Sequence, residues 1–400
     1  MKPKTILALE QALTLPYATQ RFVHLGWRVI RVESAPFPGQ TTPGDPNRYV
    51  GHPVAGPDRC SYFFGPNAGK EAITVNLKEP GGQALLGRLI SALSVDVFMV
   101  NTLPGRYEKL GIDYDTLRGF REDLIWVGIS ALGPDFPNFP GYDPALQAMM
   151  GYMHVTGDSD GMPMVCGVPV VDLKAGDEAF NQVLLALADR AETGQGRRVD
   201  ISMAQAAASW LVTYLPLLDL GGSSGQVSRN GNEHREFVPV NAYPTSDGYI
   251  YLAVGNDRQW ESLTRVDGFG TLARPDLATN AGRQASREFI HLAIGAITKQ
   301  HTTADLSERL AAGGLVHAPI NSLEDVVAQP FTRKAMPITA LPDGKPVHLA
   351  PPAVDTPHLA EVGNDLSLPP GYGEHNDAVF AEVGLTDAEL ATLREGGIIT

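Results

Sequence analysis

The stretch "VDVFMVNTLPGRYEKLG", residues 95–111, decides the fold class. Its first part, 95–101, is apolar at nearly every position, which is typical of a parallel strand buried between helices. The asparagine and the basic residues that follow predict a loop and a first helical turn at the carboxyl end of this strand. Open α/β sheets bind their ligands at such strand ends.

The same pattern extends outward through the first two hundred residues. Runs rich in Val and Ile predict strands at 27–33, 72–77, 95–101, 124–130, 168–172 and 197–203. Helical periodicity lies between them, at 15–26, 80–93, 144–152 and 176–191. This alternation predicts an α/β fold, a Rossmann-like, doubly wound parallel sheet.

Beyond residue 205 the texture changes. The glycine- and serine-rich chain around 221–226 predicts a linker over 206–228. "AYPTSDGYIYLAVGND" (242–257) predicts a hairpin, and helical patterns follow at 257–265, 285–299 and 303–312. We therefore expect a large domain at 1–205 and a small α+β domain at 229–330. Residues 331–400 are predicted to form a proline-rich linker and two helices that return to the large domain.

Composition limits the function classes. With 43% apolar and 19% charged residues the chain is of ordinary globular composition, and its net charge of −14 argues against nucleic acid and anionic membranes as partners. Two cysteines suit a reducing cytoplasm. The apolar run at 6–9 imitates a signal peptide, but Glu10 and Gln11 interrupt it. No run approaches the length of a membrane span, so we predict a cytoplasmic protein.

Familiar cofactor and nucleophile motifs are missing. No G-x-G-x-x-G follows the first strand–helix unit, and "GPNAGK" (65–70) is not a P-loop because Glu71 follows it. The histidines are scattered without H-E-x-x-H or C-x-x-C, so no metal is predicted. No G-x-S-x-G elbow supports a serine hydrolase.

One carboxylate has a conspicuous position. In "GVPVVDLKAGDEAF" (167–180), Asp172 lies between the apolar run and the helical pattern. Aspartate is a favoured helix N-cap that stabilises a helix by about 1 kcal/mol. Alternatively, the N–H groups and dipole of the helix would hold the carboxylate ionised and nucleophilic. The residues alone leave both interpretations open.

Basic residues follow the strand with which this section began. Asn101, Arg106 and Lys109 lie just beyond its carboxyl end. They could bind phosphate groups there, together with exposed backbone N–H groups. A solvated loop is an equally good interpretation of these residues alone.

Taken together, many stretches resemble the class III CoA-transferases, the family that includes formyl-CoA transferase, carnitine CoA-transferase and the α-methylacyl-CoA racemases. The resemblance covers nearly the whole chain. It is carried by "LPYATQRFVHLGWRVIRVE" (15–33), "GDPNR" (44–48), "NAGKEAITVNLK" (67–78), "VNTLPGRYEKLGIDYDTL" (100–117), "GYDPALQAMMG" (141–151), "LLALADRAETGQGRRVDISM" (184–203), "RNGNEH" (229–234), "DGYIYLAVGNDRQW" (247–260) and "GEHNDAVFAEVGLTDAEL" (373–390).

The resemblance implies a site and an assembly. Its nucleophile is the aspartate before the helix that runs to T-G-x-G, and Asp172 matches it. Coenzyme A, bound as a thioester substrate and not as a tightly held cofactor, would contact Leu13, Thr14, Asn67, Lys70, Asn101, Lys109, Tyr142 and Asp143, with Arg106 beside them. The family fold implies an interlocked homodimer.

The resemblance also implies the chemistry. Asp172 would attack an acyl-CoA to give an aspartyl anhydride and then an aspartyl-CoA thioester, and a small carboxylic acid would accept the CoA. Dicarboxylates are favoured, and a transfer between two carboxylates of one acid would use the same residues. A second carboxylate needs a cation, for which Arg48, His52 and Arg235 are candidates.

Two alternatives remain beside the transferase. The racemase branch needs a histidine where this chain has Tyr142, 172 − 142 = 30 positions before Asp172. Because tyrosine has a pKa of about 10, it exchanges α-protons poorly at neutral pH. The second alternative, a CoA-binding subunit of a heteromeric transferase, would be supported by a lost nucleophile, but Asp172 is present.

The sequence departs from the family pattern at two places. Ser34 follows Glu33 where the family often has arginine, which leaves Arg31 or Lys70 for the 3′-phosphate of CoA. The loop at 232–240 lacks the glycine run of formyl-CoA transferase. Formyl-CoA and oxalate are therefore not transferred to this chain as substrates.

Overall fold

The chain forms two compact units in a computed structural model that describes residues 2–36 and 39–400. The first unit comprises Met1–Met150, Gly167–Val212 and Pro330–Thr400, and the second comprises Gly151–Cys166 and Thr213–Gln329. The C-terminal segment thus belongs to the same unit as the N-terminal one. The sequence did not suggest that 151–166 belongs with the second unit.

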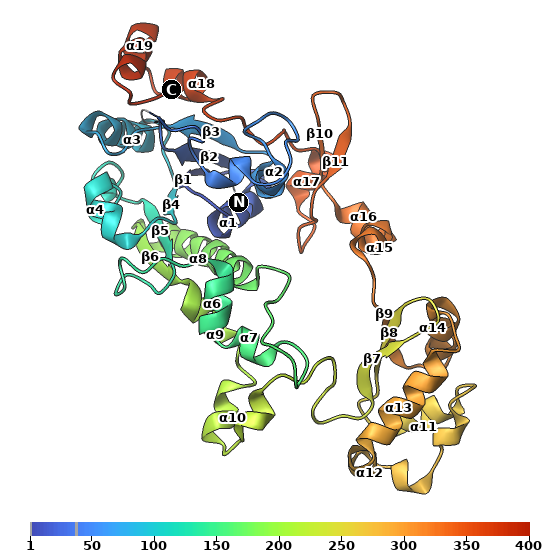
Figure 1. Ribbon diagram of the computed structural model, residues 1–400. Helices are drawn as coiled ribbons and strands as arrows, with labels where there is room; N and C mark the ends of the chain where they lie inside the picture. Colours follow the sequence, from blue (N-terminus) through green and yellow to red (C-terminus); the bar gives the residue numbers. More distant parts are fainter. Residues whose placement is uncertain (1, 37–38) are drawn as a thin grey trace. The chain divides into compact units, whose positions relative to one another are not determined.

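A six-stranded parallel sheet forms the centre of the first unit (Figure 1). Its strands are β1 (Thr5–Leu9), β2 (Arg28–Glu33), β3 (Glu71–Thr74), β4 (Val97–Val100), β5 (Ile125–Ser130) and β6 (Arg197–Ser202). They lie in the order β3-β2-β1-β4-β5-β6, and every neighbouring pair is parallel. This is the Rossmann strand order, so the predicted doubly wound sheet is confirmed.

Two sequence predictions about this sheet are wrong. The apolar run at 6–9 is part of the central strand β1, which was missed because five residues give little periodicity. The expected strand at 168–172 does not form, because helix α8 (Val170–Thr193) already begins at Val170. Val170 and Val171 therefore belong to the first helical turn, although β-branched residues favour strands.

Helices cover both faces of the sheet. Helices α1 (Thr14–Val23) and α8 pack against each other and against strands on one face. On the other face, α3 (Pro80–Ala92), α18 (Asn376–Glu382) and α19 (Asp387–Glu395) share one apolar cluster with the strands (Figure 1). Burial of that cluster at roughly 25 cal/mol per Å² of apolar surface is the main stabilising contribution.

The remaining elements of the first unit are short. They are η1 (Pro46–Tyr49), α2 (Ser61–Asn67), η2 (Pro104–Arg106), α4 (Tyr107–Leu110), α5 (Tyr114–Arg118), α6 (Asp143–Met149), α9 (Met203–Ser209), α16 (Pro330–Ala335), β10 (Ile338–Ala340), β11 (Pro346–His348) and α17 (Pro357–Glu361). The last four include a small antiparallel hairpin, β10–β11. That hairpin lies in the proline-rich region, for which the sequence predicted only a linker.

A glycine sets the distance between α1 and α8. A Cβ atom at Gly176 would lie 2.7 Å from Cδ1 of Tyr17 and 2.8 Å from the carbonyl oxygen of Thr14. Both distances are shorter than real Cβ contacts, so only glycine permits this approach. The close packing brings the first turns of the two helices together.

The second unit has its own sheet and core. Strands β7 (Val240–Pro244), β8 (Tyr249–Ala253) and β9 (Val316–Pro319) form an antiparallel sheet. The predicted β7–β8 hairpin is confirmed, whereas β9 was missed. The helices of this unit are α7 (Tyr152–Val155), α10 (Leu215–Asp219), α11 (Asp257–Arg265), α12 (Asn280–Ala285), α13 (Arg287–Thr298), α14 (Thr303–Ala312) and α15 (Leu323–Ala328), with short 3-10 turns at η3 (Ser224–Val227), η4 (Gly270–Leu272) and η5 (Pro275–Leu277).

The region predicted as a linker is partly helical. Residues 206–228 contain the end of α9, the whole of α10 and the turn η3. Within residues 2–36 and 39–400, no helix has both the length and the apolar character that crossing a membrane requires.

Candidate active site

A pocket opens at the carboxyl ends of the parallel strands. Its volume is about 520 Å³, within the range that small-molecule ligands occupy. The loops after β1, β2, β3 and β4 line it, through Leu9, Glu10, Gln11, Val32, Glu33, Ser34, Ala35, Gly44, Asp45, Val75, Asn76, Leu77, Lys78, Asn101, Thr102, Arg106, Lys109 and Leu110. It therefore lies at the switch point between β1 and β4, where doubly wound sheets bind ligands.

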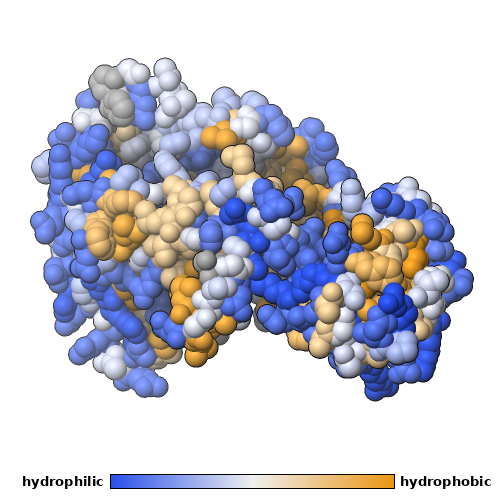
Figure 2. All heavy atoms as spheres, turned by 60° about the horizontal axis from the view of Figure 1, so that its bottom comes forward, coloured by the Kyte–Doolittle hydropathy of each residue, from blue (hydrophilic) through white to orange (hydrophobic). Residues whose placement is uncertain are grey.

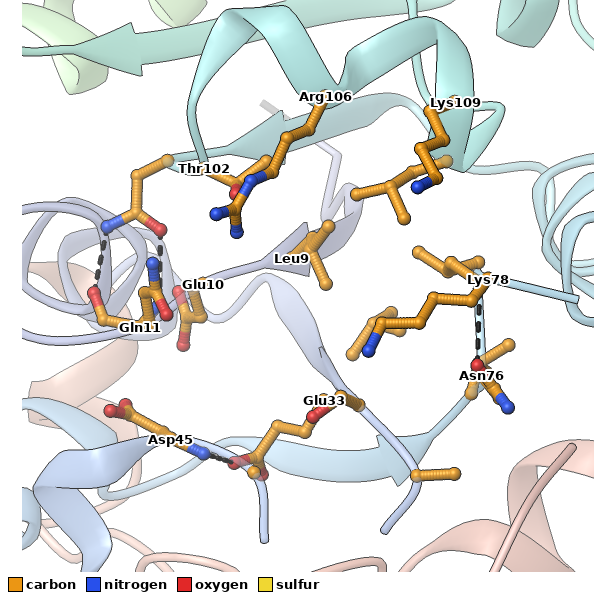
Figure 3. A pocket seen from close by; sticks show the side chains of 18 residues that line it. Leu9, Glu10, Gln11, Glu33, Asp45, Asn76, Lys78, Thr102, Arg106 and Lys109 are labelled. Atoms are coloured by element: carbon orange, nitrogen blue, oxygen red, sulfur yellow. Dashed lines mark hydrogen bonds between the residues drawn. The ribbon is translucent and has the colours of Figure 1, made fainter. Parts of the chain in front are cut away.

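Positive side chains surround part of this pocket. Arg106 and Lys109 extend into it from the segment after β4, and Lys78 reaches in from the segment after β3 (Figure 3). All three are solvent-exposed in a protein of net charge −14. They supply the local basic patch that an anionic ligand requires. The prediction that Arg106 and Lys109 lie together at the ligand edge agrees with their place here.

A buried ionic network lies behind the acidic wall of the pocket. Glu33 accepts from Nη2 of Arg48 at 2.5 Å, Asp45 accepts from Arg31 at 3.0 Å, and Glu10 accepts from Lys70 at 2.8 Å. All six side chains are buried. Although burial raises the pKa of the Glu33 carboxyl, Arg31 and Arg48 outweigh it and hold that pKa below its ordinary range. Each charge therefore has a partner.

Three predicted ligand contacts belong to this interior region. The ammonium of Lys70 donates to Glu10, Thr19, Asn67 and the carbonyl of Pro16 at 2.7–3.1 Å. The amide of Asn67 donates to the carbonyl of Phe63 at 2.8 Å. Arg48 also donates to the carbonyl of Pro370 at 2.8 Å. The structure thus places Asn67, Lys70 and Arg48 in the scaffold and not on the pocket wall, because buried charges require partners.

Asp172 lies in the first turn of α8, not before it. The N-cap position is Pro169, and Asp172 does not cap the helix. Instead, the carboxylate of Asp143, from α6, accepts from the N–H groups of Val171 at 2.7 Å and of Asp172 at 3.1 Å. Asp143 is buried, and it also accepts from Nε2 of Gln147 at 2.6 Å. The helix terminus at which the sequence placed Asp172 as a candidate cap is therefore occupied by another carboxylate.

The charge of Asp172 is consequently disfavoured. Its only side-chain hydrogen bond recorded among the described residues comes from the hydroxyl of Thr14, and no ion pair joins it. Burial raises the pKa of its carboxyl to about 6; the Thr14 hydrogen bond opposes this, and the negative charge of Asp143 adds to it. The expectation that the helix terminus lowers this pKa is thus wrong.

The loop between β1 and α1 links Asp172 to the pocket. Gln11 lines the pocket, and Thr14, three residues later, donates to Asp172. Three residues span at most about 11 Å, so this short loop joins a lining residue to the hydrogen-bond donor of Asp172, which does not itself line the pocket. Leu13 is the N-cap of α1 in the same loop. The prediction that Leu13 and Thr14 lie at the ligand edge agrees with this arrangement.

The other predicted residues lie at different places. Tyr142 is the N-cap of α6, and 75% of it is exposed. His52 is exposed on the loop before α2. Arg235 belongs to the second unit, where it donates to the carbonyls of Gly225, at 2.9 Å, and of Ser228. A contact of these three residues with substrate stays a prediction.

Several lining residues were missed by the sequence analysis. Gln11, Ser34, Asn76 and Lys78 line the pocket but were not named as site residues. Ser34 and Lys78 each directly follow a predicted strand, at 27–33 and 72–77. Because carboxyl ends of parallel strands meet at one edge, that position was a usable signal. Gln11 had no such signal because β1 itself was missed.

Metal chemistry has no evident ligand set. Among the described residues, no three His, Cys, Asp or Glu side chains gather as metal ligands would. The polar groups of the site are the carboxylate of Asp172, the hydroxyl that donates to it, and a pocket lined by both basic and acidic side chains.

Comparison with known proteins identifies the family of this chain. The profile of CoA-transferase family III matches residues 2–376. The succinate–glutarate CoA-transferase of Agrobacterium fabrum is 31% identical over 390 residues, 94% of either chain. The mouse succinyl-CoA:glutarate CoA-transferase is 31% identical and covers 81% of this chain and 72% of its own. A crystal structure of a CaiB/BaiF family protein from Brucella suis is 31% identical, with a TM-score of 0.81 over 95% of this chain and 98% of its own.

The extent of these matches over nearly the whole chain leads to one conclusion: the chain belongs to CoA-transferase family III.

Proposed function

We propose that this enzyme moves CoA from an acyl-CoA thioester to a small dicarboxylic acid through covalent intermediates on Asp172. The observation that carries the proposal is the environment of this carboxylate: it is half-buried, has no cation beside it among the described residues and has a raised pKa, and the loop that holds its hydrogen-bond donor also lines a pocket with exposed basic side chains. Relatives named as transferases of succinate, succinyl-CoA and glutarate support the substrate class.

The environment suits a nucleophile that must become neutral. At pH 7 a carboxyl of pKa about 6 is mostly ionised and more basic than an ordinary aspartate. When it attacks a thioester carbonyl, the C–S bond breaks, CoA thiolate leaves and a mixed anhydride forms. The negative charge leaves Asp172 in this step. Burial and the nearby Asp143 carboxylate, which disfavour the charge, therefore favour the acylated form.

The remaining steps use the same carboxyl group. The thiolate attacks the aspartyl carbonyl, the donor acid leaves as a carboxylate, and an aspartyl-CoA thioester remains. The acceptor carboxylate attacks this thioester and releases the thiolate. The thiolate then attacks the acceptor's own carbonyl, which yields the new acyl-CoA and regenerates Asp172. The thioester's free energy is conserved throughout, so no ATP is needed.

Thr14 has a defined role in this sequence. Its hydroxyl donates to Oδ1 of Asp172 in the resting enzyme. In each tetrahedral adduct at the aspartyl carbonyl, the negative charge develops on an oxygen of the same group, where a positioned donor is most effective. We propose that Thr14 stabilises this oxyanion.

Intermediate trapping tests the proposal. The enzyme is incubated with succinyl-CoA and glutarate, and the formation of glutaryl-CoA is followed by mass spectrometry. Hydroxylamine added during turnover should convert Asp172 to its hydroxamate, which peptide mapping detects. Asp172→Asn should bind CoA but transfer less than about a thousandth as fast. Asp189→Asn, which changes an exposed aspartate of the same helix, is the matched control.

Three outcomes would contradict the proposal. Turnover by Asp172→Asn at the normal rate would exclude the nucleophile. Exchange of the α-proton of a 2-methylacyl-CoA with deuterated water would indicate the racemase instead. Activity that appears only with a second, different chain would indicate a subunit of a heteromeric transferase.

We also propose that the protein is an interlocked homodimer, as the family resemblance implies, and that it is cytoplasmic, as the sequence predicts. Large apolar side chains are exposed in each unit, among them Phe136 and Trp210 in the first and Leu218 and Leu220 in the second. Figure 2 shows such orange patches within a mostly hydrophilic surface. Exposed apolar side chains in patches mark interaction surfaces. Light scattering at micromolar concentration should give twice the chain mass of 42.8 kDa, and a monomer would contradict the dimer.

A further inference from the structure

The side-chain carboxamide of Asn101 hydrogen-bonds to the backbone of Gln11 at the switch point of the sheet. β1 and β4 pair up to Leu9 and Val100, so Asn101 is the first residue beyond the ladder. Its Nδ2 donates to the carbonyl of Gln11 at 2.8 Å, and its Oδ1 accepts from the N–H of Gln11 at 3.1 Å. Figure 3 shows both bonds at Gln11 as dashed lines. A single carboxamide thus makes both bonds to one residue, as the opposite residue of an antiparallel strand would.

The next residue of the loop is held from another direction. Ala12 has a φ of 60°, in the left-handed region that residues other than glycine rarely adopt. Its N–H donates to Oδ1 of Asp45 at 3.1 Å. The other oxygen of Asp45 is held by Arg31 in the buried network. Such a strained backbone persists only where its surroundings enforce it, and it often occurs at functional sites.

The restrained loop leads directly to the nucleophile. Leu13, the N-cap of α1, has no side-chain capping bond, and the following residue, Thr14, donates its hydroxyl to Asp172. Only two residues separate Gln11 from Thr14. Because this segment is so short, a displacement of Gln11 should also move Thr14. The direction of the Thr14 hydroxyl therefore depends on how Gln11 and Ala12 are held.

We propose that Asn101 is a positioning residue, which acts through the Gln11 peptide on Thr14 and thereby on Asp172, and not chiefly a contact of the CoA ester. This inference rests on the proposed function of Asp172. It changes the role predicted for Asn101 from the sequence, where its place at the ligand edge suggested a direct contact.

The two roles predict different kinetics. A residue that binds CoA equally in the ground and transition states changes KM, whereas a residue that aligns the reacting groups changes kcat. Misplacement of a catalytic group by about 1 Å can cost about a hundredfold in rate. We therefore expect Asn101→Ala to lower kcat by about 10- to 100-fold and to change the dissociation constant of CoA less than about threefold.

A double-mutant cycle tests the route through Thr14. Asn101→Ala, Thr14→Val and the double variant are compared in kcat and in the pH dependence of kcat. If Asn101 acts through Thr14, Asn101→Ala should lower kcat little further once the hydroxyl is absent, since coupled residues are not additive. Asn101→Ala alone should also move the midpoint of the pH profile upward, because a weakened Thr14 bond stabilises the ionised Asp172 less.

Asn76 offers a matched control. It lines the same pocket, and its carboxamide also bonds to backbone: Nδ2 donates to the carbonyl of Gly397 at 3.2 Å, and Oδ1 accepts from the N–H of Lys78 at 3.2 Å. It has no bond to the loop between β1 and α1. Asn76→Ala should therefore change kcat by the same factor in the parent enzyme and in the Thr14→Val variant.

Clear results would overturn the proposal. These are a tenfold or greater loss of CoA affinity with kcat retained, or effects of Asn101→Ala and Thr14→Val that multiply independently. Thermal unfolding shows whether Asn101→Ala folds. If it does not, Asn101→Asp is used in its place, because aspartate retains the acceptor for the N–H of Gln11 but lacks the donor to its carbonyl. Failure of the proposed function itself is seen separately, as full turnover by Asp172→Asn.

Discussion

Two carboxylates of the first unit, Glu33 and Asp172, have opposite electrostatic surroundings. Glu33 is buried, and the guanidinium groups of Arg31 and Arg48 hold its pKa low. Asp172 is half-buried, has a hydroxyl as its hydrogen-bond donor, and has a pKa of about 6. This difference indicates two roles for charged groups in the site. Buried charges with partners, such as Glu33, stabilise the scaffold, whereas a carboxylate without a cationic partner among the described residues, such as Asp172, is a candidate for catalysis.

The largest change in stability should follow from removing the buried charge of Glu33, which is paired with Arg31 and Arg48. Glu33→Gln leaves Arg48 and Arg31 with an unbalanced buried charge, so we expect the free energy of unfolding to fall by about 3–5 kcal/mol. Urea unfolding at pH 7 measures this. Glu382→Gln removes an exposed partner of Arg28 and should change stability by less than about 1 kcal/mol. Equal effects of the two variants would contradict the distinction.

Removing the charge of Asp172, which has no cationic partner in the described part of the chain, should raise the free energy of unfolding. Asp172 has a pKa of about 6 in the folded protein, against about 3.9 when unfolded, so ionisation favours the unfolded state. This penalty is absent below about pH 4, grows between about pH 4 and 6 and is complete above, where it reaches at most about 3 kcal/mol. Asp172→Asn should therefore stabilise the protein at pH 8 and lose this advantage at pH 4. A variant less stable than the parent at pH 8 would refute the assignment.

The same pKa predicts how activity depends on pH. Only the ionised carboxylate attacks, so the rate should be flat above about pH 7 and fall about tenfold per pH unit below about pH 6. Asp143→Asn keeps an oxygen for the N–H groups of Val171 and Asp172 but removes the like charge. The midpoint of the profile should move to lower pH. An unchanged midpoint would show that burial alone sets this pKa.

The smallest effects are expected at the exposed cations of the pocket. Lys109→Ala and Arg106→Ala should each weaken CoA binding by about 1 kcal/mol, or about fivefold, and less at high salt, because solvent and ions screen such charges. Isothermal titration in low and high salt measures this. Arg118→Ala, at an exposed arginine on α5 that does not line the pocket, is the control. Salt-independent losses would argue against contacts with phosphate.

The sequence allowed part of the site to be predicted, for physical reasons. Arg106 and Lys109 follow a predicted strand that is apolar at nearly every position, and this pattern together with the α/β rule predicts their edge of the sheet. The role proposed for Asp172 came from the resemblance, since the residues alone favoured a helix cap. Five-residue β1 was missed, and with it Gln11, because so short a run has no readable period.

Partners of buried charges were beyond the sequence. Lys70 and Arg48 are cations at the ligand edge and were predicted to bind ligand. The fold instead places Glu10 and Glu33 against them, and these acids are distant in the chain, 60 and 15 residues away. Charge type is visible in a sequence, whereas which charge meets which depends on the pairing of β1, β2 and β3.

By itself the sequence determined the type of sheet, the edge at which a ligand site is expected and the residue proposed as the nucleophile, because these follow from periodicity and from an ordered set of motifs. Only the tertiary structure decided the electrostatic state of that residue, Asp172. Gly176 allows α1 to pack closely against α8, and Thr14 thereby donates a hydrogen bond to Asp172. The carboxylate of Asp143 accepts from the N–H groups at the N-terminus of α8. A pKa depends on burial and on charges within a few ångströms, and these distances exist only after the chain has packed.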